Sequence, residues 1–148
     1  MPSTHTCLLY HLVFATKNRE PIIHEPWRSR LHEYLGGTAR GLGGTPQGIG
    51  GVADHVHLLV GLKPTHRLSD FMRDLKKTSS IWVAETIPQP SFQWQEGYAA
   101  FTVSASVRPT VQNYIARQED HHRHKTFREE LIELLRKSGI EYDERYLD

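Results

Sequence analysis

Hydrophobic residues recur along the chain with two different periods, and each period predicts a set of elements. Runs rich in β-branched and aromatic residues are typical of strands, and apolar residues at helical spacing indicate amphipathic helices. Strands are expected at residues 5–16, 45–53, 55–62, 92–95 and 98–104. Helices are expected to begin at Pro26, after Pro64, at Pro109 and after Thr126, whose pairing with Glu129 predicts a capping box.

The resulting order, β-α-β-β-α-β(β)-α-α, predicts an α+β fold. We expect an antiparallel sheet with helices packed on one face, as in a ferredoxin-like or RRM-like sandwich, plus C-terminal helices. A length of 148 residues suits a single domain spanning 1–148. The second face of such a sheet would be open unless a late helix approached it.

The strand at residues 55–62 carries the first candidate chemistry. Side chains of a strand alternate between its faces, so His55 and His57 share one face while Val56, Leu58 and Val60 share the other. The apolar face should pack on the helices, which leaves both imidazoles on the open face. Two imidazoles can bind a divalent ion, but a merely polar strand face explains this spacing equally well.

The helix that follows Pro109 carries the second candidate group. Tyr114 and Gln118 are four residues apart, so a helix places them on one surface. The carbonyl oxygen of Gln118 would shift a two-histidine site toward Mg²⁺ or Mn²⁺. The Tyr114 phenol, with an ordinary pKa near 10, becomes a useful nucleophile only beside a cation or a base. A core or interface tyrosine is the alternative.

Charge adds little to this picture. The net charge is +1, with ten Lys and Arg against six Asp and Glu in residues 1–80, and eight against eleven in residues 81–148. Basic side chains that could contact phosphate, or could simply be solvated, are Arg73, Lys76, Lys77 and Arg117. Cys7 is the only cysteine, which excludes a disulfide framework. Without a leader-like or membrane-spanning segment, we expect a soluble, cytoplasmic protein.

Four motifs occur together in one order along the chain. They are YHLVF at residues 10–14, HVHLLV at 55–60, FQWQEGY at 92–98 followed by Ser104, and YIARQEDHH at 114–122. In this combination the chain resembles the single-tyrosine transposases of the His-hydrophobic-His (HUH) class. These are found in small bacterial insertion sequences and include the REP-associated tyrosine transposases.

The resemblance implies a DNA transposase that cleaves and rejoins single-stranded DNA, at hairpin-bearing ends of the element. Tyr114 would be the nucleophile that forms a 5′-phosphotyrosine link and leaves a free 3′-hydroxyl. His55, His57 and Gln118 would hold Mg²⁺ or Mn²⁺. The resemblance also implies a homodimer, in which the tyrosine helix of one subunit can complete the metal site of the other.

Two alternatives from other classes are open at this point. An open antiparallel sheet could serve a non-catalytic module that binds single-stranded nucleic acid by base stacking. A hydrolytic metalloenzyme could use His55 and His57 with a bound water, in which case turnover would survive loss of Tyr114. A covalent protein–DNA adduct would distinguish the transposase from both.

Overall fold

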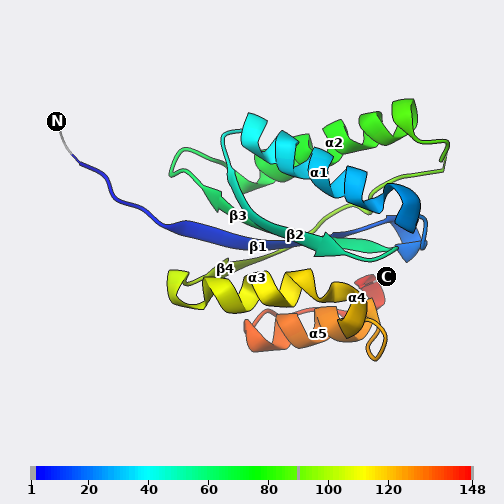
Figure 1. Ribbon diagram of the computed structural model, residues 1–148. Helices are drawn as coiled ribbons and strands as arrows, with labels where there is room; N and C mark the ends of the chain where they lie inside the picture. Colours follow the sequence, from blue (N-terminus) through cyan, green and yellow to red (C-terminus); the bar gives the residue numbers. More distant parts are fainter. Residues whose placement is uncertain (1–2, 90, 148) are drawn as a thin grey trace.

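A four-stranded antiparallel sheet forms the centre of the computed structural model, which describes residues 3–89 and 91–147 (Figure 1). The strand order is β2-β3-β1-β4. The strands are β1 (Leu8–Ala15), β2 (Thr45–Gly51), β3 (His55–Leu62) and β4 (Ala99–Val103). β2 and β3 form the hairpin that their short connection predicts.

Helices cover both faces of this sheet (Figure 1). On one face lie α1 (Glu25–Gly41) and α2 (Leu68–Thr86). On the other lie α3 (Arg108–Ala116), α4 (Gln118–His121) and α5 (Phe127–Lys137). Three short 3₁₀ helices complete the described chain: η1 (Lys17–Arg19), η2 (Ala105–Val107) and η3 (Glu144–Tyr146). The predicted fold class is confirmed, and the C-terminal helices cover the face that the first two helices leave open.

The larger core lies between the sheet and the first two helices. Alternation along β3 buries Val56, Leu58 and Val60 on this side, as the period of two predicts. β1 contributes Leu12 and Phe14 to the same core. The helices supply Trp27, Leu31 and Leu35 from α1 and Phe71, Met72 and Leu75 from α2. This core fixes β1 and β3 at the middle of the sheet, and their opposite side chains therefore have defined positions.

Two smaller apolar clusters attach the C-terminal helices to the other face. Ile115 of α3 packs against Leu9 and Leu59. Phe127 of α5 packs in a second cluster with Val13, and Leu135 of the same helix joins it. On the same face of the sheet the strands carry polar side chains, and α3, α4 and α5 enclose them.

The expected strand at residues 92–95 is not formed, which corrects that prediction. Trp94 makes only an isolated bridge with Thr16. Its indole is instead buried in the larger core, where Nε1 donates to Ser79 Oγ at 2.9 Å. The segment is irregular and is held by its buried aromatic side chains together with two backbone hydrogen bonds around the bridge, from Lys17 to Gln93 and from Gln95 to Ala15, both at 2.9 Å.

The start of α5 follows its sequence signals closely. Thr126 accepts a hydrogen bond from the Glu129 backbone, and the Glu129 side chain returns to Thr126, so the predicted capping box is present. The helix ends before Gly139, which has φ +67°. No helix among the described residues is long and apolar enough to span a bilayer.

Candidate active site

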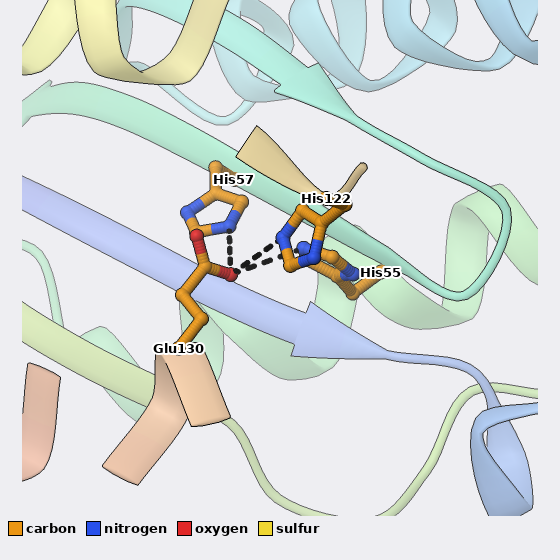
Figure 2. Close-up of side chains that lie close together, drawn as sticks. All are labelled: His55, His57, His122 and Glu130. Carbon is orange, nitrogen blue, oxygen red and sulfur yellow. Dashed lines mark hydrogen bonds and ion pairs between the residues drawn. The ribbon is translucent and has the colours of Figure 1, made fainter. Parts of the chain in front are cut away.

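The carboxylate of Glu130, on α5, lies at the centre of a cluster of imidazoles. Its side chain is 1 % exposed. The Oε1 atom is 3.0 Å from His57 Nε2, 3.1 Å from His122 Nε2 and 3.2 Å from His55 Nε2. Figure 2 shows the three rings from β3 and the end of α4 converging on this one oxygen.

The second oxygen of Glu130 contacts the other two predicted site residues. The Tyr114 hydroxyl donates a hydrogen bond to Oε2, and Gln118 Nε2 donates to the same atom at 3.0 Å. The carbonyl oxygen of Gln118 lies 3.1 Å from His55 Nε2. The structure thus brings Tyr114, His55, His57 and Gln118 to one location within a single chain.

The helix that carries Tyr114 does not continue to Gln118, although the four-residue spacing predicted one helix for both. α3 ends at Ala116, Arg117 has φ −101° and ψ +23°, and α4 begins at Gln118. Gln118 still reaches the cluster because α4 turns its side chain inward, where it is 1 % exposed.

α3 is held close to the sheet by two contacts with β2. A side-chain Cβ at Gly50 would overlap the carbonyl oxygen of Ile115, so only glycine allows this approach of the two backbones. Gln112 Nε2 also donates to the Gln47 carbonyl at 2.9 Å. These contacts set the depth at which Tyr114 enters the site.

Each of the three imidazoles is held at its other nitrogen. His55 Nδ1 lies 2.7 Å from Asp54 Oδ1, and His57 Nδ1 lies 2.7 Å from His11 Nε2. His122 Nδ1 lies 2.7 Å from the Lys125 carbonyl oxygen. A carbonyl or a carboxylate accepts from an N–H, so Asp54 and Lys125 each hold a proton on the Nδ1 atom of His55 and His122, and a second proton on either ring lies on Nε2, where it is donated to Glu130. The Nε2 atoms then face the cluster.

Burial and charge set the protonation of this cluster. Burial lowers the pKa of His57 to about 4, against the opposing effect of Glu130. Burial, reinforced by His57, lowers the pKa of His11 to about 3. Burial also acts to lower the pKa of His55, but hydrogen bonds to Asp54 and Glu130 outweigh it and raise that pKa. The pKa of His55 is thus shifted in the opposite direction to the pKa values of His57 and His11.

The pKa values of the Glu130 carboxyl and the Tyr114 phenol are shifted in opposite directions. Burial disfavours ionisation of Glu130, but hydrogen bonds from the histidines, His122 first, hold its pKa well below the usual range. Burial raises the pKa of Tyr114, and the hydrogen bond to Glu130 raises it further. Tyr114 is thus a neutral phenol beside an ionised carboxylate, so its activation needs added positive charge.

The cluster has the composition of a metal site. His55, His57, His122 and Glu130 each offer one ligand atom, and all four atoms lie within 4.8 Å of one another. In metal-binding histidines one ring nitrogen, here Nδ1, is typically held by a hydrogen bond, and the other, here Nε2, is directed at the ion. The residues present therefore fit a divalent ion.

A polar groove of about 610 Å³ opens beside Gln118. Its walls come from α1, β2 and the α3–α4 segment, and its basic side chains are Arg28, Arg117 and Arg123. Arg28 is paired with Glu119 at 3.3 Å, and Arg117 is exposed. Three carboxylates also line the groove, those of Glu25, Glu119 and Asp120, and Arg123 is paired with Asp120 at 2.8 Å, so charges of both signs lie next to the cluster.

The basic residues predicted on α2 are not brought to this location. α2 covers the opposite face of the sheet from Tyr114 (Figure 1). Lys76 Nζ donates to the carbonyl oxygens of residues 95 and 97 at 2.6 and 2.7 Å, and Arg73 pairs with Asp70 and Asp74. Lys77 is exposed on the same helix. A contact between these residues and DNA stays a prediction.

Sequence reasoning missed two members of the cluster and placed a third only loosely. Glu130 was not singled out, although it lies three residues after Phe127 and four before Leu134 on the apolar side of an amphipathic helix. A charged residue at such a position is an identifiable signal. His11, which shares a face of β1 with Val13, was likewise part of a motif without an assigned role. His122 follows Gln118 by four residues, a position that fits either contact with the site or a surface cluster of histidines.

Comparison with known proteins places the chain among transposases. Residues 4–118 match the family model for IS200-like transposases. The ISDra2 transposase TnpA of Deinococcus radiodurans is 29 % identical over 119 residues, which cover 76 % of this chain and 85 % of the relative. The IS200 transposase of Salmonella typhimurium is 29 % identical over 115 residues, covering 74 % of this chain and 75 % of the relative.

Two solved structures share the fold. One is a crystal structure from Deinococcus radiodurans described as a transposase, with a TM-score of 0.65 and 31 % identity, covering 80 % of this chain and 95 % of that one. The other is a REP-associated tyrosine transposase bound to a REP hairpin, with a TM-score of 0.59 and 13 % identity. It covers 82 % of this chain and 74 % of its own. At that identity the second likeness concerns the fold alone.

Proposed function

We propose, from the premise that the chain belongs to the family of IS200-like transposases, that it cleaves and rejoins single-stranded DNA through a covalent bond to Tyr114. One observation carries this proposal. The Tyr114 hydroxyl is hydrogen-bonded to Glu130, whose other oxygen faces His55 and His57. A nucleophile and a set of metal ligands from distant parts of the chain therefore share one enclosed site.

The reaction follows from the position of the phenol. The Tyr114 oxygen attacks a phosphodiester phosphorus, the phenol gives up its proton, and the bond from phosphorus to the 3′-oxygen breaks. The leaving oxygen takes up a proton and becomes a free 3′-hydroxyl, while the 5′-phosphate stays on Tyr114. Attack by a 3′-hydroxyl on this phosphotyrosine reverses the step, so the strand can be resealed without ATP.

His55, His57 and Gln118 supply the ligands proposed for Mg²⁺ or Mn²⁺. The ion would contribute Lewis-acid polarisation of the phosphate and positive charge beside the phenol. Asp54 and His11 keep the two imidazoles oriented by holding their Nδ1 atoms. Gln118 orients Glu130, and Glu130 keeps the Tyr114 oxygen within the site before DNA binds.

Hairpin-bearing single-stranded DNA is the proposed substrate. A structural neighbour is bound to a REP hairpin, and the groove beside Gln118 offers the exposed Arg117 to a phosphate backbone in this chain. The homodimer stays a prediction, which light scattering on the purified protein would test. Because one chain brings Tyr114 to the histidines, cleavage in this proposal requires no tyrosine from a second copy.

The non-catalytic alternative loses its main support in this fold. A stacking platform requires an open sheet face, but α3, α4 and α5 cover the face that carries His55 and His57 (Figure 1). A water-based hydrolase would use the same histidines. Such a hydrolase would leave the hydrogen bond between Tyr114 and Glu130 without a role, so attack by the tyrosine explains more of the site.

The test is a denaturing gel of the full chain incubated with a 5′- or 3′-labelled hairpin oligonucleotide, with and without Mn²⁺. We expect a covalent adduct to the 5′-phosphate side of the cut with the wild-type protein, and none with Tyr114→Phe. Tyr146→Phe, which alters a tyrosine that is 75 % exposed, is the matched control and should form the adduct normally. Adduct formation by Tyr114→Phe would refute the proposed role, and binding without any adduct would favour the non-catalytic module.

A further inference from the structure

We propose that His122 and Glu130 are ligands of the ion, and that this centre of three imidazoles and one carboxylate selects a transition ion such as Mn²⁺, Co²⁺ or Zn²⁺ over Mg²⁺. This inference rests on the proposed function only in assigning the ion a role in DNA cleavage. The ligand set itself follows from the contacts of α4, α5 and the loop between them.

The distances around Glu130 match neighbouring ligands of one ion. Ligands at right angles around an ion with bonds of about 2.1 Å lie about 3.0 Å apart. Glu130 Oε1 lies 3.0, 3.1 and 3.2 Å from the Nε2 atoms of His57, His122 and His55. Glu130 therefore has ligand spacing to all three imidazoles, and the four ligand atoms lie within 4.8 Å of one another.

His122 is held in the same way as the two predicted ligands. Its Nδ1 lies 2.7 Å from the Lys125 carbonyl oxygen, as His55 Nδ1 lies 2.7 Å from Asp54. When Nδ1 carries the only proton of the ring, Nε2 can bind an ion through its lone pair. His66 shows the contrast: its Nδ1 accepts from the Lys63 backbone and its Nε2 contacts the Leu42 carbonyl at 2.7 Å, so the backbone uses both ring nitrogens.

A cluster with this many electron-pair donors requires positive charge. The carboxylate of Glu130 and the rings of His55 and His57 are 1 %, 0 % and 0 % exposed, so water does not separate them. Protons supply that charge where a histidine donates an N–H to Glu130, and an ion supplies it in their place when all four atoms act as electron-pair donors. A divalent ion satisfies all four ligand atoms at once, whereas a proton bridges only two.

The ligand chemistry decides which ion is preferred. Mg²⁺ favours oxygen ligands and keeps several waters, whereas imidazole suits first-row transition ions. With only His55, His57 and Gln118 the set holds two nitrogens and one oxygen. Adding His122 and Glu130 gives three nitrogens and a carboxylate, which moves the preference away from Mg²⁺.

Glu130 would also link the ion to the nucleophile. Its Oε1 faces the imidazoles while its Oε2 accepts the hydrogen bond from Tyr114. A ligand carboxylate in this position holds the phenol oxygen next to the ion. Glu130 is in this sense a positioning residue for Tyr114 as well as a ligand.

The experiment measures metal binding to the full chain without DNA, by titration calorimetry with Mn²⁺, Co²⁺, Zn²⁺ and Mg²⁺ on metal-stripped protein. We expect one transition ion per chain and Mg²⁺ binding at least about 100-fold weaker than Mn²⁺. His122→Ala and Glu130→Gln should each weaken Mn²⁺ binding by about 10-fold or more. His124→Ala removes an exposed histidine from the same loop and should bind Mn²⁺ like the wild type.

Far-ultraviolet circular dichroism of the metal-free variants establishes that they are folded, and the intensity of the visible Co²⁺ spectrum reports the ligand set directly. Wild-type Mn²⁺ affinity and an unchanged Co²⁺ spectrum in folded His122→Ala would overturn the inference, as would Mg²⁺ binding within 10-fold of Mn²⁺. The two proposals fail separately. If the wild type forms adducts but His122→Ala binds metal normally, the proposed function stands and the ligand inference fails. If the variants lose metal binding as expected but the wild type forms no adduct, the ligand inference stands and the proposed function fails.

Discussion

Asp54 Oδ1 lies 2.7 Å from His55 Nδ1, so a carboxylate at the start of β3 orients the first imidazole of the site. Asp54 → Ala removes both the acceptor and its charge, whereas Asp54→Asn keeps an acceptor oxygen. We expect a loss of Mn²⁺ affinity of about 10- to 100-fold for the alanine variant and a smaller loss for the asparagine variant. Calorimetric titration measures both, with Asp74→Asn on α2 as the control. Equal affinities in all three variants would show that the Asp54–His55 contact does not orient a ligand.

Gly50 sets the distance between α3 and the sheet. A Cβ at this position would overlap the Ile115 backbone, so Gly50→Ala must push α3 outward. Overpacking of this kind costs roughly 1–3 kcal/mol of unfolding free energy. Displacement of α3 should also reduce adduct formation, because α3 carries Tyr114.

Gly37→Ala is the matched control for this effect. Gly37 lies inside α1, and an added Cβ there meets no atom within 4 Å. Alanine should stabilise that helix by about 0.5–1 kcal/mol. Urea titration gives both free energies. A Gly50→Ala variant as stable as the wild type would mean that the close approach of α3 and β2 is not required.

The parts of this site that depend on local periodicity could be predicted from the sequence. His55 and His57 are two residues apart in a strand whose other face is apolar, and strand geometry alone puts both on one side. The capping box that begins α5 is equally local, because Thr126 and Glu129 are within one helical turn.

The parts that depend on contacts between distant elements could not be predicted in this way. Glu130 is 73 residues from His57 in sequence, and only the packing of α5 across the sheet brings the two together. The interruption at Arg117 is invisible to a four-residue spacing, which treats Tyr114 and Gln118 as neighbours on one helix. In both cases the tertiary arrangement decides which side chains meet.

The error at residues 92–95 has the same origin. Phe92 and Trp94 alternate as in a strand, but their burial is achieved by contacts with the core and by the hydrogen bond from Trp94 to Ser79. Lys76 Nζ donates hydrogen bonds to the carbonyl oxygens of residues 95 and 97, at and just after the end of this segment. Residue types typical of strands therefore indicate burial here more than pairing, which is limited to the single bridge between Trp94 and Thr16.

His32 should make stability depend on pH. Burial, with a smaller contribution from Arg28, lowers the pKa of His32 to about 4, whereas in the unfolded chain the ordinary value is 6.5. Below pH 6.5 the unfolded chain binds a proton that the folded chain does not. The stability associated with His32 is therefore complete above pH 6.5 and is lost as pH falls toward 4.

His32→Leu removes this group while keeping a helix-forming side chain of similar size. At pH 7 the variant should be at least as stable as the wild type, because His32 Nε2 has no hydrogen-bond partner among residues 3–89 and 91–147. At pH 4 the variant should be more stable by about 1–3 kcal/mol, since each pKa unit corresponds to about 1.4 kcal/mol. Urea titrations at both pH values measure the difference. A difference in unfolding free energy between variant and wild type that does not change with pH would contradict a lowered pKa of His32.

Arg117 should contribute to DNA affinity, and Lys77 should not. Arg117 is exposed on the wall of the groove beside Gln118, whereas Lys77 lies on α2 behind the opposite face of the sheet. Loss of one phosphate contact lowers affinity at low salt and reduces the slope of log affinity against log salt by about 1. Fluorescence anisotropy with a labelled hairpin oligonucleotide should therefore show weaker and less salt-dependent binding for Arg117→Ala. Lys77→Ala should match the wild type, and a larger loss with Lys77→Ala would place the DNA path over α2.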